Sequence, residues 1–296
     1  MRIVSLLPSA TEMLFALGAG DDVVGVTFEC DSPPEARTRR VVSTSALPEG
    51  LAPAEIDAVV AARMAAGEDL YRLDAGALAG LDADLVVTQD LCAVCAVDVS
   101  VVDDALAHLG CGAEVLTLDP QDLEQVLASV GTLGAAVGRA EEAADLHQRL
   151  RARLDVVERA VDGLPRVGTA VLEWTDPPFA PGHWVPDMVE AAGGRCVLGE
   201  GGARSARTTW EAVAAAEPEV IVSAPCGFGL ADSVRLAEQV VAAGPLPGGV
   251  PVWAVDANAS FARPGPRLVD GIEALAAVLH PGAGLPLDAR LAHRVA

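Results

Sequence analysis

The chain has 296 residues, which is enough for one large domain or for two lobes with separate cores. Its composition is 51% hydrophobic with no low-complexity segment, which indicates a folded globular protein rather than a disordered one. The formal net charge is −22, and every one of the strongly basic residues is arginine. This charge argues against nucleic acid and anionic membrane surfaces as partners, because both would repel the chain.

The N-terminal segment MRIVSLLPSATEMLFALG predicts no export signal. One arginine is followed by a short apolar run that reaches Pro8, which is too short for the apolar core of a signal peptide. No apolar stretch approaches the ~18 residues of a membrane span, so membrane insertion is not expected. The sequence therefore predicts a cytoplasmic protein whose six cysteines are thiols or ligands rather than disulfides.

Short strands and helices alternate along the first 120 residues. Ser9 is the predicted N-cap of the first helix, with Glu12 at the capping-box position. The predicted strands are residues 2–6, 23–27, 41–42, 85–88 and 115–118, and the predicted helices after the first are 53–66, 74–81 and 99–109. Such alternation is typical of a parallel sheet covered by helices on both faces.

Residues 121–163 carry helical spacing without a strand signal, interrupted only by a glycine-rich stretch at 131–138. The alternation then resumes, with predicted strands 167–173, 220–223 and 250–255 and predicted helices 185–192, 209–216, 233–242 and 267–279. The predicted fold class is α/β, with two Rossmann-like parallel-sheet lobes joined by a single long helix. The expected boundaries are 1–120 for the first lobe, 121–163 for the linking helix and 164–296 for the second lobe.

Polar and aromatic side chains gather just after the predicted strands. Ligands of open parallel sheets bind beyond the carboxyl ends of the strands, so these residues are the candidate site. The candidate ligand-binding residues are Glu29, Gln89, Glu173, Trp174, His183, Trp184, Phe228, Asp256, Asn258 and Phe261.

Four of the six cysteines also follow predicted strands. These are Cys30, Cys92, Cys95 and Cys226, whereas Cys111 and Cys196 lie elsewhere and are interpreted as packing residues. Thiolates bind zinc and iron–sulfur clusters, and an imidazole can complete the set, so the four cysteines with His183 are candidate metal ligands. The alternative is that the C-x-x-C pair is two small residues in a tight loop, since cysteine is often buried.

Three further side-chain types in these loops have two interpretations each. His183, in the loop GHWVP, either approaches a metal centre or is satisfied by backbone groups. The loop aromatics, Phe179 among them, either form flat apolar walls for a ligand or pack between lobes. Glu173 is either an acid with a raised pKa or, as the preferred interpretation, the ion-pair partner of Arg263 or Arg267. No G-x-S-x-G elbow, P-loop or H-E-x-x-H motif supports a hydrolase, an NTPase or a zincin.

Several stretches resemble the class III, helical-backbone periplasmic binding proteins, which are receptors for cobalamin, heme, siderophores and metal ions. The resemblance covers nearly the whole chain and is strongest to the cobalamin-binding branch, including its non-secreted members. It is carried by RIVSLLPSATEMLFALGAGDDVVGVT, ECD, LCAVCAV, EWTDPPFAPGHWVP, PCGF and NASFARPGPRLVDG. The resemblance implies a ligand cleft between the two lobes.

Two functions from different classes follow. The first is a cytosolic binding protein for cobalamin, another corrinoid or a related metal chelate. The second is a metal–thiolate protein, possibly an enzyme, that uses an iron–sulfur or zinc site in the same cleft. The resemblance also implies an acidic residue on each lobe for docking a permease. Glu211 matches one, but the other falls near Gly76, which has no side chain, and this weighs against permease docking.

Overall fold

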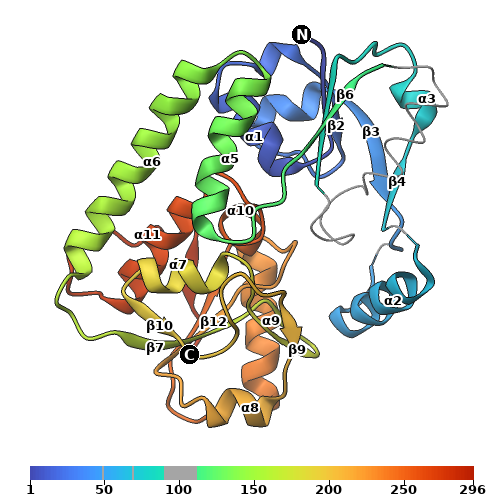
Figure 1. The fold of residues 1–296 in the computed structure, drawn as a ribbon. Helices are drawn as coiled ribbons and strands as arrows, with labels where there is room; N and C mark the ends of the chain where they lie inside the picture. Colours follow the sequence, from blue (N-terminus) through green and yellow to red (C-terminus); the bar gives the residue numbers. More distant parts are fainter. Residues whose placement is uncertain (49, 69, 90–111) are drawn as a thin grey trace. The chain divides into compact units, whose positions relative to one another are not determined.

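The computed structural model describes residues 1–48, 50–68, 70–89 and 112–296, and these form two compact units. The N-terminal unit comprises Met1–Pro120 and Leu127–His147, and the C-terminal unit comprises Gln121–Val126 and Gln148–Ala296. Each unit is built on a mainly parallel sheet, so the predicted α/β class is confirmed (Figure 1).

The N-terminal sheet has the strand order β4-β3-β2-β1-β5-β6, and only β4 runs antiparallel to its neighbour. Its strands are β1 (Ile3–Ser5), β2 (Val23–Thr27), β3 (Arg40–Ser45), β4 (Tyr71–Leu73), β5 (Leu85–Thr88) and β6 (Glu114–Thr117). All residues of β1 and β5 are buried, as expected for central strands of a parallel sheet with covered faces.

The first helix of this unit begins at Pro8 rather than after Ser9. Leu7 is the N-cap of α1 (Pro8–Ala16) and makes no side-chain cap, so the predicted Ser9 capping box is wrong. Proline is favoured at the first helical position because its fixed φ suits the helix and its missing N–H would be unpaired there. The other helical segments are the 3-10 helices η1 (Gly20–Asp22) and η2 (Pro34–Thr38), and α2 (Pro53–Ala66) and α3 (Ala75–Leu78). The predicted helix 99–109 lies outside the described residues.

The segment expected as one linking helix is two helices, α5 (Leu123–Ala136) and α6 (Ala140–Val161), as Figure 1 shows. Gly138 ends α5 in the left-handed region, with φ of 68°. The N–H of Arg139 donates to Gly134 O at 2.7 Å and that of Gly138 to Ala135 O at 3.3 Å. This is a Schellman motif, which satisfies the last carbonyls of a helix and turns the chain away from the helix axis.

The C-terminal sheet has the order β10-β7-β12-β13-β14, with β14 antiparallel to β13. Its strands are β7 (Val167–Leu172), β10 (Gly194–Cys196), β12 (Val220–Ser223), β13 (Val252–Val255) and β14 (Ala292–Arg294). A small second sheet contains β8 (Trp174–Thr175), β9 (Pro178–Ala180) and β11 (Ala206–Arg207). Its strands β8 and β9 follow the end of β7 directly, so they continue the chain from an interior strand of the larger sheet.

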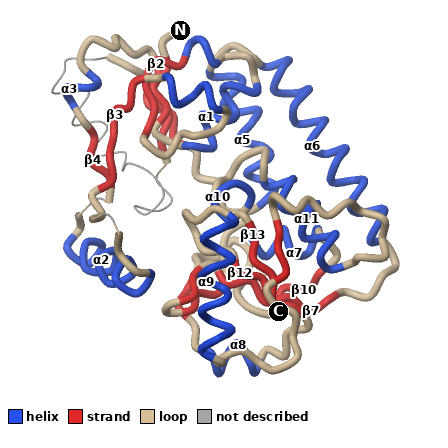
Figure 2. The backbone as a smooth tube through the Cα atoms, turned by 180° about the vertical axis from the view of Figure 1, so that it is seen from behind, coloured by secondary structure: helices blue, strands red, loops and turns tan. Residues whose placement is uncertain are grey.

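Five helices complete this unit: α7 (Val185–Ala191), α8 (Trp210–Ala215), α9 (Leu230–Ala243), α10 (Ala257–Ser260) and α11 (Leu268–Leu279). Figure 2 shows α9 beside β12 and β13, both of which it contacts. Nearly every residue of α11 is buried, so this helix belongs to the core.

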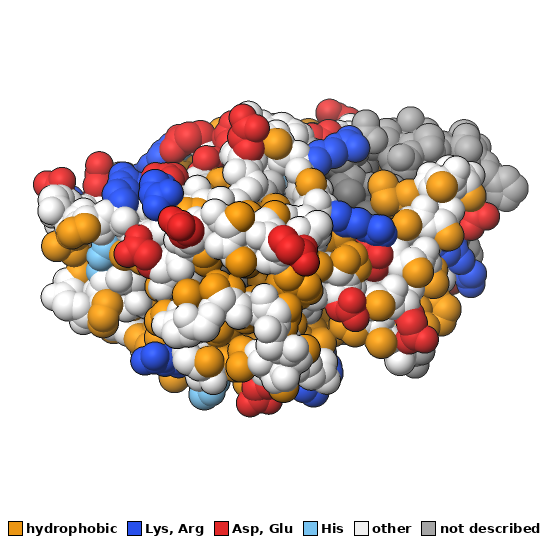
Figure 3. All heavy atoms as spheres, turned by 90° about the horizontal axis from the view of Figure 1, so that it is seen from below, with side chains coloured by type: hydrophobic (Ala, Val, Ile, Leu, Met, Phe, Trp, Pro, Cys, Tyr) orange, Lys and Arg blue, Asp and Glu red, His pale blue; other side chains and the backbone are white. Residues whose placement is uncertain are grey.

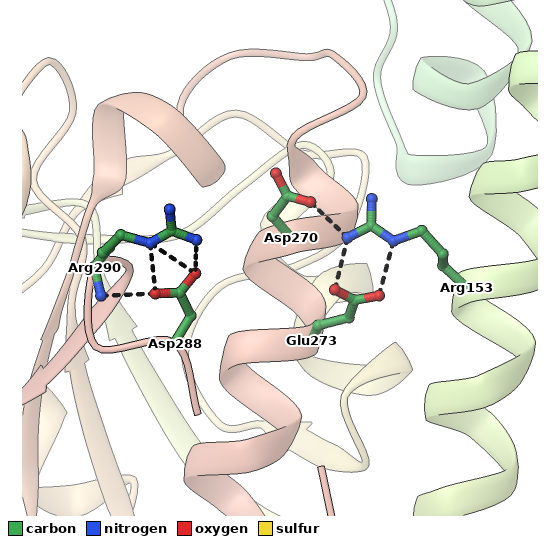
Figure 4. Close-up of polar contacts among 5 residues, drawn as sticks. All are labelled: Arg153, Asp270, Glu273, Asp288 and Arg290. Atoms are coloured by element: carbon green, nitrogen blue, oxygen red, sulfur yellow. Dashed lines mark hydrogen bonds and ion pairs between the residues drawn. The ribbon is translucent and has the colours of Figure 1, made fainter. Parts of the chain in front are cut away.

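Arg153 joins α6 to α11 through a forked ion pair. Its Nε donates to Glu273 at 2.8 Å, and its Nη2 donates to Glu273 at 2.6 Å and to Asp270 at 2.5 Å (Figure 4). The two carboxylates raise the pKa of Arg153. Figure 4 also shows the pair of Asp288 and Arg290, whose partners lie two residues apart and join no separate elements.

None of the helices in the described part of the chain is both long enough and apolar enough to cross a membrane.

Candidate functional site

Each sheet has one point at which the strand order reverses. In the N-terminal sheet β1 lies between β2 and β5, and in the C-terminal sheet β7 lies between β10 and β12. At such a point the loops that follow the two neighbouring strands diverge, and this is where ligands of open α/β sheets bind. Ligand-contacting residues are therefore expected after β1 and β5, and after β7 and β12.

Glu173 follows β7 directly. Ser205 Oγ donates a hydrogen bond to Glu173 Oε2, and the N–H of Gly182 donates to Oε1 at 3.4 Å. Although part of the residue remains accessible to solvent, burial of the carboxyl raises the pKa of Glu173 to about 7. The preferred prediction, an ion pair with Arg263 or Arg267, is wrong, because the contacts of Glu173 are with Ser205 and Gly182.

The loop that carries His183 packs closely on the loop of residues 199–205. A Cβ at Gly182 would lie 2.4 Å from Ala203 O, so only glycine permits this approach. The N–H of His183 donates to Ala203 O at 2.6 Å, and its carbonyl accepts from Gly202 at 3.0 Å. These bonds hold His183 in the left-handed region at φ of 49°, which is uncommon for a side chain of this size.

One nitrogen of the His183 imidazole is buried and makes no hydrogen bond to the described residues. Its Nε2 has no hydrogen-bond partner in the described structure, whereas both backbone groups are satisfied. Burial, followed by the positive charge of Arg204, lowers the pKa of His183, which favours the neutral ring. A neutral imidazole offers a lone pair to a metal or to a donor group.

Two of the predicted aromatic residues, Trp184 and Phe261, are buried in the C-terminal unit. Trp184 Nε1 donates to Phe261 O at 2.7 Å, and the Trp184 ring lies 5.6 Å from that of His183. Asp256 is the N-cap of α10 and accepts from Ala259 N at 3.0 Å. In this structure these three residues hold the site loops in place.

Trp174 and Phe228 form a partly exposed aromatic pair, with ring centroids 5.6 Å apart. The loops that carry them are joined by backbone bonds, from Cys226 N to Glu173 O and from Asn258 N to Phe228 O, both at 3.0 Å. The structure thus brings together the ends of β7, β12 and β13, with aromatic surface accessible beside Glu173.

In the N-terminal unit, Glu29 accepts a hydrogen bond of 2.9 Å from the hydroxyl of Tyr71. The Tyr71 ring lies 5.9 Å from that of Phe28, which is 41% exposed. Cys30 is buried, with its Sγ 3.0 Å from Thr11 Oγ1. Gln89, which follows β5, is also buried, and neither of its amide atoms has a partner within the described residues.

The predicted metal cluster receives no support. Cys92 and Cys95, like Cys111, lie outside the described residues, and Cys30 and Cys226 belong to different units. Within residues 1–48, 50–68, 70–89 and 112–296, no group of three His, Cys, Asp or Glu side chains is placed to hold a metal ion. Cys196, interpreted as a packing residue, donates from Sγ to Leu198 O, and burial raises its pKa to about 11.

Ser205, Tyr71 and Ser9 were not among the predicted site residues. Ser205 reaches Glu173 across 32 positions in the chain, and Tyr71 reaches Glu29 across 42. Neither residue follows a predicted strand, so the strand-end rule does not find them. Ser9, whose buried Oγ has no partner within the described residues, does follow a predicted strand. It was interpreted as a helix cap and was therefore not proposed as a site residue.

Comparison with known proteins identifies relatives of this fold. A sequence model of the family described as periplasmic binding protein matches residues 3–243. A periplasmic heme-binding protein from Pseudomonas aeruginosa is similar with a TM-score of 0.70 and 23% identity over 99% of this chain and 97% of that one. The periplasmic heme-binding protein BhuT, solved with two hemes, has a TM-score of 0.69 and 21% identity over 96% of this chain and 99% of its own.

The periplasmic vitamin B12 binding protein BtuF of Vibrio cholerae has a TM-score of 0.64 and 20% identity over 95% of this chain and 96% of that one. No curated protein matches the sequence. The match to a family of periplasmic proteins contradicts the predicted cytoplasmic location and points to a periplasmic or extracellular one. The prediction rested on the lack of a signal-peptide pattern in the first residues of this sequence, and the family match overrides it.

Proposed function

The chain belongs to the periplasmic binding protein family, and on that premise we propose that it is a solute-binding protein for a corrinoid of the cobalamin class. The structural relatives named above bind heme or vitamin B12, both of which are metal-containing tetrapyrrole-type macrocycles. The loops after β7, β12 and β13 would contact the ligand.

The observation that carries this proposal is the buried, unpartnered Nε2 of His183. An unmade hydrogen bond of a buried polar atom costs about 1–3 kcal/mol, so a ligand that supplies a partner is favoured. The lowered pKa keeps the imidazole neutral, as coordination of a metal requires. We propose that His183 approaches an axial face of the corrinoid cobalt.

The aromatic pair supports a flat macrocyclic ligand, and the net charge favours a corrinoid over heme. Trp174 and Phe228 offer flat apolar surface suited to a macrocycle. Heme carries two propionate carboxylates, which a chain of net charge −22 repels, whereas the corrinoid periphery carries neutral carboxamides. Heme is the second candidate, because two of the solved relatives bind it.

The surface does not strengthen a permease partner. Glu211 is exposed in the first turn of α8, where the resemblance places one docking acid, and Gly76, at the other position, is exposed without a side chain. Permease docking through one acidic residue on each lobe is therefore not expected.

The test is a spectral titration with cobinamide, a corrinoid without the nucleotide base that can occupy an axial position. We expect binding with a shift of the corrinoid bands, and a loss of that shift with at least about tenfold weaker binding in His183→Asn. Asparagine tolerates the left-handed backbone, so this change leaves the loop intact. His293→Ala, an exposed histidine of β14, is the control. An unchanged spectrum and affinity in His183→Asn would reject the role of His183.

A further inference from the structure

We propose that Ser9, Gln89 and the first turn of α1 form a subsite that binds a neutral carboxamide group of the ligand. This inference rests on the proposed function, since it names the chemical group by which the N-terminal unit would recognise a corrinoid. It is independent of the aromatic pair and of His183, which belong to the other unit.

Strand register places Gln89 on the face of the sheet that α1 covers. Ser5 pairs with Val87, and the N–H of Leu6 donates to Val87 O at 2.8 Å. Side chains two residues apart on a strand share a face. Gln89 is the residue directly after β5, and we infer that the alternation continues to it, which places it on the face of Val87 and Ser5. Ser5 Oγ accepts from Thr11 Oγ1 of α1 at 2.8 Å, which identifies that face as the one under α1.

Three buried polar atoms at this place have no hydrogen-bond partner within the described residues. Ser9 is 0% exposed and its Oγ is unpaired, and Gln89 is 2% exposed with both Oε1 and Nε2 unpaired. Most buried side-chain polar atoms in folded proteins are paired, so an unpaired group of this kind requires an explanation. Here the atoms come from the residue directly after β5 and from the start of α1, on the two sides of the strand-order reversal.

The start of α1 adds donors to this set. Leu7, at the N-cap, makes no side-chain cap, so the first N–H groups of the helix are not satisfied by it. The first turn contains no acidic residue that would interact with them. Backbone N–H groups, the Ser9 hydroxyl and the Gln89 amide together offer donors, and Ser9 Oγ and Gln89 Oε1 also offer acceptors.

A carboxamide matches this set better than a carboxylate does. Its oxygen accepts from N–H groups while its NH₂ donates to Gln89 Oε1, whereas a carboxylate only accepts and leaves Oε1 unpaired. A helix N-terminus alone would also accept a carboxylate. However, Gln89 Oε1 would face such a carboxylate with no proton between them, so the whole set favours the carboxamide.

The experiment compares two ligands with the same corrin ring, cobinamide with its peripheral carboxamides and cobyrinic acid with carboxylates in their place. We expect the wild type to prefer cobinamide. Ser9→Ala and Gln89→Leu should each bind cobinamide about tenfold more weakly, with little change for cobyrinic acid. Ser223→Ala is the matched control, because Ser223 Oγ is also buried and unpaired but lies among apolar residues that include Leu172 and Ala237.

The melting temperature of each unliganded variant separates recognition from structure. Removing a buried polar group that lacks a partner should leave the melting temperature unchanged or raise it. The inference is overturned if both variants bind cobinamide as the wild type does, if they lose cobyrinic acid equally, or if they melt lower without ligand. If the wild type binds neither corrinoid, the proposed function fails as well. The wild-type titration alone decides this outcome, without any variant.

Discussion

Glu173 and His183 illustrate what a strand-end residue can become once the chain folds. Both were predicted as candidates because the pattern of β7 and its loop is local in the sequence. Their environment is not local. Ser205, which bonds the Glu173 carboxylate, and Ala203, which accepts from the His183 N–H, lie 32 and 20 positions farther along the chain. Close packing at Gly182 brings their loop to the site. The same limit applies to Trp184, whose indole bond to Phe261 spans 77 positions. A sequence pattern cannot distinguish such an anchor from a ligand-binding ring.

The raised pKa of Glu173 predicts a stability that falls as pH rises. The native state holds this proton up to about pH 7, whereas an unfolded glutamate releases it near its ordinary value of 4.5. The stabilisation is therefore complete below about pH 4.5 and is lost as pH rises through 7, to an extent of up to about 3 kcal/mol. Glu173→Gln should be more stable than the wild type at pH 8 and lose that advantage at pH 5, as measured by urea unfolding at both pH values. A constant difference between the two proteins at all pH values would contradict this origin.

At the scale of elements, the strands and most helices were predictable because hydrophobic alternation and flanking turns are local signals. The break between α5 and α6 was visible as a glycine-rich stretch, but helical spacing continued across it. What decides the break is the positive φ of Gly138 together with the two Schellman hydrogen bonds, donated by the N–H groups of Gly138 and Arg139. Chain order likewise indicated parallel sheets, whereas the antiparallel edge strands β4 and β14 are too short for a distinct pattern.

Gly131, inside α5, and Gly138, just after its end, should respond in opposite directions to the same change. Gly138→Ala places a Cβ in the left-handed region and should cost about 1 kcal/mol of unfolding free energy. Gly131 lies inside α5 with open space where a Cβ would be, so Gly131→Ala should stabilise by about 0.5–1 kcal/mol. Chemical unfolding of both variants measures this, and equal signs would show that Gly138 does not terminate the helix as described.

The Arg153 fork predicts a measurable contribution from one ion pair between elements. Arg153→Ala should destabilise by about 1 kcal/mol, because the guanidinium is partly buried and bidentate but still screened by solvent. Arg290→Ala removes an exposed pair between near neighbours and should leave the melting temperature unchanged. Similar losses in both variants would indicate that the fork adds nothing beyond an ordinary surface pair.

For the whole molecule, the composition predicts net repulsion between surface charges. Figure 3 shows acidic and arginine side chains interspersed with apolar ones over one face. The excess of 42 acidic over 20 basic residues makes self-repulsion a general cost of the folded state. The cytoplasmic prediction rested on the N-terminal segment rather than on this excess, and family membership corrects it.

Salt should therefore stabilise the protein. Raising sodium chloride from low concentration to about 0.5 M screens repulsion between surface charges and should raise the melting temperature by a few degrees. The same concentrations of a neutral osmolyte control for solute effects. A melting temperature that falls with added salt would show that attractive pairs outweigh the net repulsion.

If the proposed function holds, the protein binds a corrinoid more tightly than heme. Calorimetric titration of the wild-type protein with cobalamin and, separately, with heme tests it most directly. We expect one-to-one binding of cobalamin with a Kd at least about tenfold lower than that of heme, a difference of about 1.4 kcal/mol in binding free energy. Tighter binding of heme, or no heat with cobalamin at large excess, would contradict it.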